Sequence, residues 1–142
     1  MRKFILALSS LALFSSVAHA DPIADRKAIM KERGGLVGGL APVAKGEKPF
    51  DAAAVLTALQ ALEANAKKWD EDALFPVGSE TGDTKASPKI WEDMAGVKAA
   101  GDKFEADVAA AVAAPPADLA AFQAQFGAIT SNCGACHQAY RM

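Results

Sequence analysis

Two cysteines and a histidine stand together near the end of the sequence. Cys133 and Cys136 are the only cysteines among the 142 residues, and His137 follows directly. The C-x-x-C-H spacing puts two thiols about one helical turn apart, where they can add to the two vinyl groups on one side of a porphyrin. The adjacent imidazole can then reach the iron. The motif therefore predicts one covalently attached haem c, with His137 as an axial iron ligand.

Two other uses of these residues are possible. A redox-active Cys-x-x-Cys disulfide normally follows a strand at the start of a helix, whereas this chain shows no strand pattern and the motif lies near the end of an expected helix. A zinc site needs four ligands in its structural form, and this cluster offers three. Because both cysteines and the one histidine beyond residue 20 fall in the motif, haem attachment is the better interpretation.

The N-terminal segment has the pattern of an export signal. Arg2 and Lys3 precede a short apolar stretch, residues 4–14, and Ala18-His19-Ala20 is a small-x-small cleavage site. This pattern predicts a signal peptide over residues 1–20, cleaved after Ala20, and a periplasmic mature domain over residues 21–142. The alternative is an uncleaved anchor, but the apolar stretch falls short of the ~20 residues that a membrane span needs.

The charge of the expected mature domain is mildly acidic. The full chain has 15 Lys and Arg and 17 Asp and Glu side chains, and removal of Arg2 and Lys3 leaves 13 against 17, a net charge of −4. Such a balance gives no reason to expect a nucleic-acid partner or an anionic membrane surface. The length suits one domain with one core.

The alanine-rich sequence shows four segments with apolar residues at helical spacing. They cover residues 21–44, 51–69, 87–114 and 118–142, with N-caps expected at Asp21, Asp51, Ser87 and Asp118. Pro42 is expected to kink the first helix or end it early. Residues 70–87 are expected to form a long loop, of the kind that often wraps a cofactor. The fold class expected is all-α, an antiparallel four-helix bundle around a covalently attached haem.

With these elements in place, the sequence resembles the class II c-type cytochromes, the cytochrome c′ family, over essentially the whole mature chain. A C-x-x-C-H motif alone indicates only c-type haem, but here it ends a long helix and three further pieces occur in order. The matching pieces are Arg26-Lys27-Ala28-Ile29-Met30, Lys45-Gly46-Glu47-Lys48-Pro49-Phe50-Asp51, Pro88-Lys89-Ile90-Trp91 and Cys133-Gly134-Ala135-Cys136-His137-Gln138-Ala139-Tyr140-Arg141.

The resemblance implies roles for particular residues. His137 would be the proximal iron ligand, Met30 the distal residue four positions after Arg26, and Arg141 a basic residue near the haem. The family has two variants. One is five-coordinate with an open distal site, and its low-spin relatives use a methionine of the first helix as the sixth ligand. Met30 fits both variants.

The same side chains also have simpler interpretations. Met30 on a helix stripe can be core packing. Arg26 and Arg33 lie in the otherwise apolar stripe of the first helix, where a guanidinium pairs well with a haem propionate, but either side chain can also point into solvent. Arg141 can belong to a frayed helix end.

Two functions follow as hypotheses. The first is an electron carrier that exchanges electrons with redox partner proteins, with His137 and Met30 on the iron. The second is a five-coordinate protein that binds nitric oxide or carbon monoxide at an open distal site. An enzyme is not expected, because no paired carboxylates stand at catalytic spacing and the distal side offers no histidine. Family members are often homodimers packed through their first two helices, which the small residues of 34–41 would allow.

Overall fold

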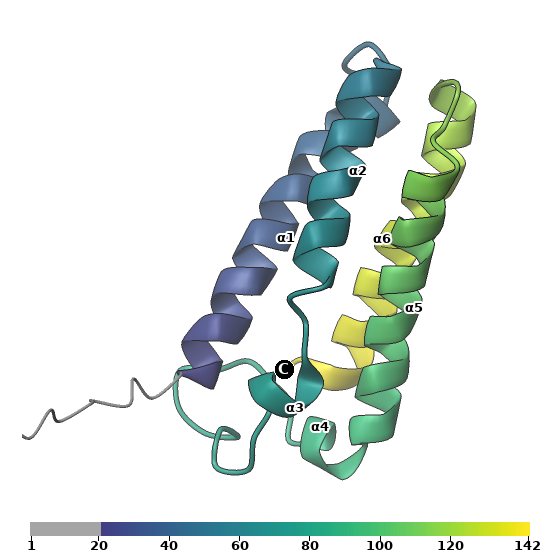
Figure 1. The fold of residues 1–142 in the computed structure, drawn as a ribbon. Coiled ribbons are helices and arrows are strands. Elements are labelled where there is room, and N and C mark those ends of the chain that lie inside the picture. Colours follow the sequence, from purple (N-terminus) through teal and green to yellow (C-terminus); the bar gives the residue numbers. More distant parts are fainter. Residues whose placement is uncertain (1–20) are drawn as a thin grey trace, which may run out of the picture.

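The computed structural model describes residues 21–142, and these residues form a helical protein (Figure 1). The predicted signal peptide and its cleavage site after Ala20 lie outside the described residues. The helices are α1 (Pro22–Ala44), α2 (Ala52–Ala66), α3 (Glu71–Leu74), α4 (Lys89–Glu92), α5 (Met94–Ala113) and α6 (Leu119–Tyr140). None of them combines the length and the apolar character that a bilayer crossing requires.

An aspartate caps the N-terminus of each of the four long helices. Asp21 accepts hydrogen bonds from two backbone amides of the first turn of α1. Asp51, Asp93 and Asp118 each accept one bond, from the amide three residues further on, at 2.9, 3.0 and 2.8 Å. Each such cap stabilises a helix by about 1 kcal/mol. The predicted caps at Asp21, Asp51 and Asp118 are therefore confirmed. The predicted cap at Ser87 is wrong, because α4 begins at Lys89 with Pro88 as its N-cap residue and has no side-chain cap hydrogen bond.

The third predicted helix is divided in two. A single helix was expected from Ser87 onwards, but the chain bends at Asp93, which separates α4 from α5 with φ −136° and ψ 54°. The Asp93 carboxylate accepts hydrogen bonds from the Gly96 amide and from the Tyr140 hydroxyl at 2.7 Å. An aspartate that bonds to nearby donors competes with the helical backbone, so the apolar stripe continues while the helix does not.

Two smaller expectations also need correction. Pro42 does not end the first helix, because α1 continues to Ala44. The predicted loop over residues 70–87 contains one helical turn, α3, whose N-cap is Asp70. The rest of that segment is irregular, as expected.

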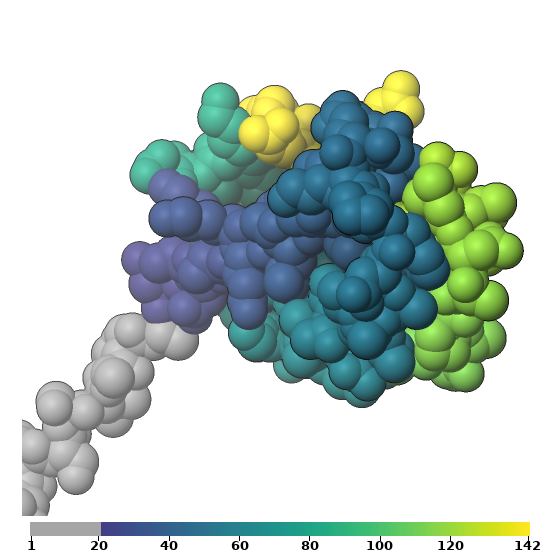
Figure 2. All heavy atoms as spheres, turned by 90° about the horizontal axis from the view of Figure 1, so that it is seen from above, coloured from purple at the N-terminus to yellow at the C-terminus, as the bar shows by residue number. Residues whose placement is uncertain are grey.

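The four long helices form an antiparallel four-helix bundle, which confirms the predicted fold class. In this bundle α1 contacts α2, α2 contacts α5, α5 contacts α6, and α6 contacts α1. Figure 1 shows the α1–α2 and α5–α6 connectors at one end, and Figure 2 shows both from above, in blue and light green. The opposite end holds α3, α4 and the C-terminus.

Two apolar clusters fill the bundle. The larger one occupies the half nearer the connectors and includes Leu40, Leu59, Phe122 and Ile129. The smaller one is formed by Leu74, Phe75 and Ile90 of the segment that joins α2 to α5, together with Val97 of α5. Along α6 the larger cluster reaches Cys133, and the smaller one begins again at Tyr140. The C-x-x-C-H motif therefore lies between the two clusters.

Candidate functional site

The cysteines and the histidine of the motif line one cavity of about 230 Å³. Cys133 and Cys136 are half-buried free thiols, and His137 is exposed toward the cavity that they share. Met30 of α1 lines the same cavity. The structure thus brings together three residues of α6 and the predicted distal residue of α1, which stand far apart in the sequence.

The walls of this cavity are mainly apolar. Residues of α1, α5 and α6 contribute, together with Trp69, which follows α2. The lining residues are Met30, Arg33, Gly34, Val37, Trp69, Ala100, Gly101, Phe104, Asn132, Cys133, Cys136 and His137. Such a space, with few polar groups at fixed positions, is typical of a cofactor site.

A second and more open cavity of about 680 Å³ adjoins the first. The two share Met30, Trp69, Cys136 and His137, whereas Cys133 lines only the first. The wall of the second cavity is strongly basic. Its charged lining residues are Arg26, Lys27, Lys31, Asp83, Lys85 and Arg141, with His137 beside them.

The ionisation of the motif residues follows from burial. Burial raises the pKa of both the Cys133 and Cys136 thiols. Partial withdrawal from water lowers the pKa of His137, and the positive charges of Arg141 and Arg33 lower it further. A neutral imidazole has a free nitrogen lone pair, which is the form that binds a metal.

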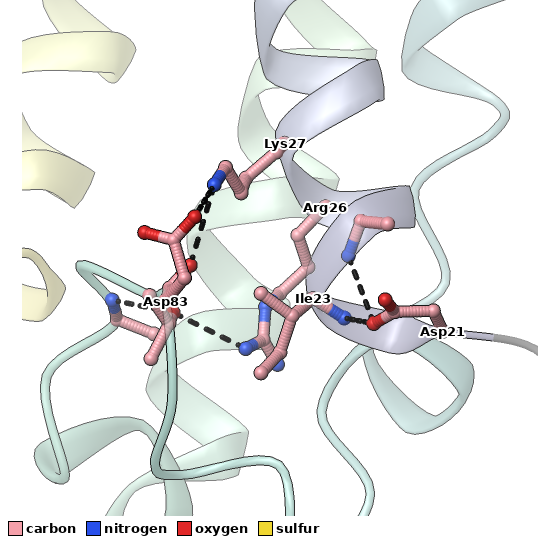
Figure 3. Close-up of polar contacts among 8 residues, drawn as sticks. Asp21, Ile23, Arg26, Lys27 and Asp83 are labelled. Atoms are coloured by element: carbon pink, nitrogen blue, oxygen red, sulfur yellow. Dashed lines mark hydrogen bonds and ion pairs between the residues drawn. The ribbon is translucent and has the colours of Figure 1, made fainter.

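Arg26 is buried, and both terminal nitrogens of its guanidinium donate to the end of α3 and to the loop between α3 and α4; Figure 3 shows one of these bonds. One terminal nitrogen donates to the Leu74 carbonyl at 2.8 Å and to the Ser79 hydroxyl at 3.0 Å. The other donates to the Ser79 carbonyl at 3.0 Å and to the Thr84 hydroxyl at 3.2 Å. The guanidinium also lies 4.8 Å from the centre of the Phe75 ring. In this structure Arg26 therefore holds the loop against α1, and a contact with a propionate stays a prediction.

Further contacts close the same loop over the open cavity. Lys27 forms an ion pair with Asp83, as Figure 3 shows. At the other side, the Ser87 amide donates to the Tyr140 carbonyl and the Met142 amide donates to the Lys85 carbonyl, both at 2.9 Å. The loop is thereby fixed to both the first and the last helix.

Arg141 is the C-cap residue of α6 and lines the open cavity. Its amide donates to the His137 carbonyl at 3.1 Å, and its backbone pairs with Ala86 in an isolated bridge. The end of α6 is therefore held in place, and the role of Arg141 as a basic residue near the haem stays a prediction.

Arg33 has a different environment from Arg26. It is 9% exposed, and its Nε donates to the Asn65 side-chain oxygen at 2.8 Å. The Nη2 atom is buried and has no hydrogen-bond partner among residues 21–142. Since buried polar groups are nearly always paired, this nitrogen is an exception among the described residues.

Asn65 and Trp69 are site residues that the sequence pattern does not indicate. Asn65 is fully buried, and it stands three residues after Leu62 on the apolar face of α2. A polar residue at a core position was the signal that could have found it. Trp69 lines both cavities.

The residues present fit a covalently attached haem. In residues 21–142 no three His, Cys, Asp or Glu side chains cluster to hold a metal ion by themselves, so the thiols and imidazole do not form a zinc-type site. They do offer two thioether attachment points and one iron ligand beside an apolar cavity. The basic wall of the second cavity suits carboxylates.

Comparison with known proteins also indicates a c-type haem protein. A family model described as Cytochrome C′ matches residues 21–141. Cytochrome c-556 of Agrobacterium fabrum is 42% identical over 127 residues, which span 89% of this chain and 85% of that protein. Cytochrome c′ of Rhodopseudomonas palustris is 40% identical and aligns over 99% of this chain and 97% of its own length.

Solved structures agree in fold. Cytochrome c′ from Rhodopseudomonas palustris superposes with a TM-score of 0.80 at 41% identity, covering 87% of this chain and 98% of that one. A nitric oxide complex of a cytochrome c prime variant from Alcaligenes xylosoxidans superposes with a TM-score of 0.75 at 33% identity, covering 85% and 94%. Both similarities extend over the bundle that carries the motif.

Proposed function

This chain belongs to the cytochrome c′ family of haem c proteins, and on that premise we propose that it is a periplasmic electron carrier. In this proposal Cys133 and Cys136 attach one haem through thioether bonds. His137 is the proximal iron ligand and Met30 the distal one. The bound haem supplies a one-electron couple between ferric and ferrous iron, and the chain holds it, sets its potential and exposes one edge to redox partner proteins.

The observation that carries the proposal is that all four residues line one cavity. The motif residues are fixed on one face of α6, and Met30 reaches the same space from α1, a helix that contacts α6. A ligand on each side of a ring is the arrangement of a six-coordinate haem. A thioether paired with an imidazole raises the potential of the iron, which suits electron transfer.

The basic side chains of the second cavity would hold the propionates. Porphyrins carry vinyl groups and propionates on opposite edges, so a ring tethered at Cys133 and Cys136 directs its propionates away from the thiols. The open cavity extends from Cys136 toward Arg26 and Arg141. Both arginines are therefore proposed to face the propionate edge, Arg26 while it also holds the loop.

Binding of a diatomic gas is the second candidate. It is favoured by the similar protein whose solved structure is a nitric oxide complex. On this alternative Met30 packs over the ring without binding iron, and the distal site is open to nitric oxide or carbon monoxide. The two candidates differ in one property, the coordination number of the iron.

A visible spectrum of the mature protein, expressed with a cytochrome c maturation system, tests both. We expect haem that stays attached through denaturing electrophoresis, a low-spin spectrum with a methionine–iron charge-transfer band, and slow carbon monoxide binding. His137→Ala should lose the native coordination, because residues 21–142 contain no second histidine. A high-spin wild type that binds carbon monoxide rapidly would replace the carrier with the gas-binding function.

The processing of the chain is part of the proposal. Asp21, the residue that follows the predicted cleavage site, is the N-cap of α1. The mature protein recovered from the periplasm should have Asp21 as its N-terminal residue by mass spectrometry. A homodimer through α1 and α2 also stays a prediction, and sedimentation equilibrium would test it.

A further inference from the structure

Arg33 is a buried cation beside the two attachment cysteines. It lines the cavity that contains Cys133, Cys136 and His137. Its guanidinium carbon lies 4.3 Å from the centre of the Phe104 ring and 5.3 Å from that of Trp69. The two aromatic rings favour a cation at this place, and together with the surrounding chain they keep it out of water.

Asn65 fixes the orientation of this guanidinium. The Asn65 amide nitrogen donates to the Ile29 carbonyl at 3.2 Å and to the Glu32 carboxylate at 2.9 Å. Since both of these partners are acceptors, the amide oxygen must face the Nε of Arg33. Lys68 in turn forms an ion pair with Glu32 at 2.8 Å. A chain of four polar side chains thus runs from the surface to the cavity.

The charge of Arg33 is not neutralised by an ion pair in the described chain. Its Nε bonds to a neutral amide and its Nη2 has no partner. Glu71 is the carboxylate whose charge acts on Arg33. Glu71 and Arg33 line a common small cavity of about 100 Å³, but no hydrogen bond joins them. Burial of an unpaired charge is costly, so the buried charge of Arg33 indicates a functional role.

A contact with a propionate does not provide that function. Arg33 lies near Cys133, which lines only the smaller cavity, and it is absent from the lining of the open cavity. A ring tethered at the thiols has its propionates on the opposite edge, among the other basic residues. Arg33 would therefore lie beside the tethered edge of a bound haem, close enough for its charge to act on the ring.

We propose that Arg33, oriented by Asn65, is the cation that sets the reduction potential of this haem. The inference rests on the proposed function. Reduction of the iron removes one positive charge, so a fixed cation in a poorly screened site favours the ferrous form. Burial and the charge near the centre are recognised means by which a protein tunes a haem. Arg33 thereby raises the potential, and Asn65 is its positioning residue.

The test is the midpoint potential of the holoprotein with Arg33 replaced. Arg33→Met removes the charge at similar length, and we expect the ferrous-to-ferric ratio at a fixed applied potential to fall at least tenfold, which is 59 mV for one electron. Arg33→Lys keeps a charge and should recover at least half of that fall. Lys45→Met is the matched control. It removes the same charge from an exposed site at the far end of α1. At the same applied potential, the ferrous-to-ferric ratio of this variant should stay within threefold of the wild-type ratio.

Asn65→Ala tests the positioning role. It leaves the charge in the chain but removes the acceptor that orients it, so the potential should fall by less than in Arg33→Met. If Arg33→Met is recovered without haem, Arg33→Gln takes its place, because its amide can still donate to Asn65.

The outcomes separate the inference from its premise. A wild type without covalent haem would overturn the proposed function. Haem that is attached with an unchanged spectrum, but with the same potential in wild type and in the neutral Arg33 variant, would overturn only the role of Arg33. A fall in Arg33→Lys equal to that in Arg33→Met would also overturn it, since the effect would then follow from packing rather than charge.

Discussion

Met30 is the only residue of α1 with a thioether, and it lies where the two cavities meet. Its flexible side chain can either bind the iron or cover the ring. The position one turn after Arg26 puts both on one face of the helix. Arg26 is anchored in the loop by four hydrogen bonds, so the helical turn that presents Met30 is held firmly.

Met30→Ala should open the distal side of the haem. We expect the spectrum to change from low-spin to high-spin and the carbon monoxide affinity of the ferrous protein to rise at least about tenfold, or about 1.4 kcal/mol. Met94→Ala is the control, because Met94 packs on the smaller apolar cluster and lines neither cavity. Equal spectra for Met30→Ala and wild type would remove Met30 from the iron.

Glu71 makes a pH-dependent contribution to stability. It is 9% exposed, and burial raises its pKa above the usual value for glutamate, while Lys98 opposes the shift. Between the unfolded and the folded pKa the native state holds a proton that the unfolded state has released. Stability from this group is therefore present at low pH and is lost as pH rises through the folded pKa.

Glu71→Gln should remove this dependence. In urea denaturation of the holoprotein at a series of pH values from 4 upward, the stability of wild type relative to the variant should decrease and then become constant. Glu47→Gln, a change at an exposed carboxylate, serves as the control. A difference between wild type and Glu71→Gln that does not vary with pH would show that the carboxyl is ionised equally in both states.

At this scale the sequence was informative about residue types and silent about distant partners. The C-x-x-C-H spacing is local, so the cavity-lining positions of Cys133, Cys136 and His137 could be predicted. The acceptors of Arg26 lie in the loop near Leu74 and Ser79, and that of Arg33 is Asn65. No periodicity reports such pairs, so the sequence leaves both arginines with the same two interpretations, a propionate contact or exposure to solvent, and the structure shows both side chains buried.

Among the helices, beginnings were easier to predict than continuity. Asp21, Asp51 and Asp118 cap their helices through contacts within three residues, which a sequence displays directly. The break at Asp93 depends on Tyr140 of another helix. Because the apolar stripe runs on unbroken through the bend, the pattern alone favoured one helix.

Gly96 is required by this junction of α5 and α6. A Cβ atom built there would overlap the Tyr140 hydroxyl and the Asp93 carboxylate. Gly96→Ala should therefore weaken both the cap and the Tyr140 contact and lower the melting temperature, despite the higher helix propensity of alanine.

The matched control is Gly127→Ala in α6. Nothing lies within 4 Å of a Cβ at that position, so the change should stabilise the protein by about 0.5–1 kcal/mol. Thermal denaturation of the two variants should give shifts of opposite sign. A rise in melting temperature for both variants would mean that the Asp93–Tyr140 contact can shift to admit a Cβ atom without loss of stability.

For the molecule as a whole, the bundle could be predicted because four stripes of similar length leave few ways to bury them. The location of the cavity between two apolar clusters could not. It arises because Met30, Gly101 and Cys133, on three helices, come to the same level of the bundle. The height of a residue along the bundle axis depends on the lengths of the connectors and on how far the helices are shifted along each other. The spacing of apolar residues within one helix contains no information on either.

Loss of the haem should weaken the entire fold. A chain with both Cys133→Ala and Cys136→Ala cannot form thioether bonds, so it should show no haem after denaturing electrophoresis. The apolar cavity of about 230 Å³ would then lack its contents. At about 24 cal/mol per Å³ of cavity, the cost is on the order of 5 kcal/mol. Calorimetry should show a lower melting temperature than for the holoprotein, and haem retained on the denatured double variant would contradict the attachment.

The contact between α1 and α6 joins the first and last long helices of the bundle. Contacts between such distant segments carry the largest loop-closure cost and tend to form late in folding. The space beside Cys133 and Cys136 has α1 as one wall, so it does not exist until that contact forms. We therefore expect a preferred order of maturation, in which the thiols are joined to the cofactor while α1 is still undocked and the bundle closes afterwards. A refolded cofactor-free chain should accordingly be converted more slowly than the same chain kept open in mild urea.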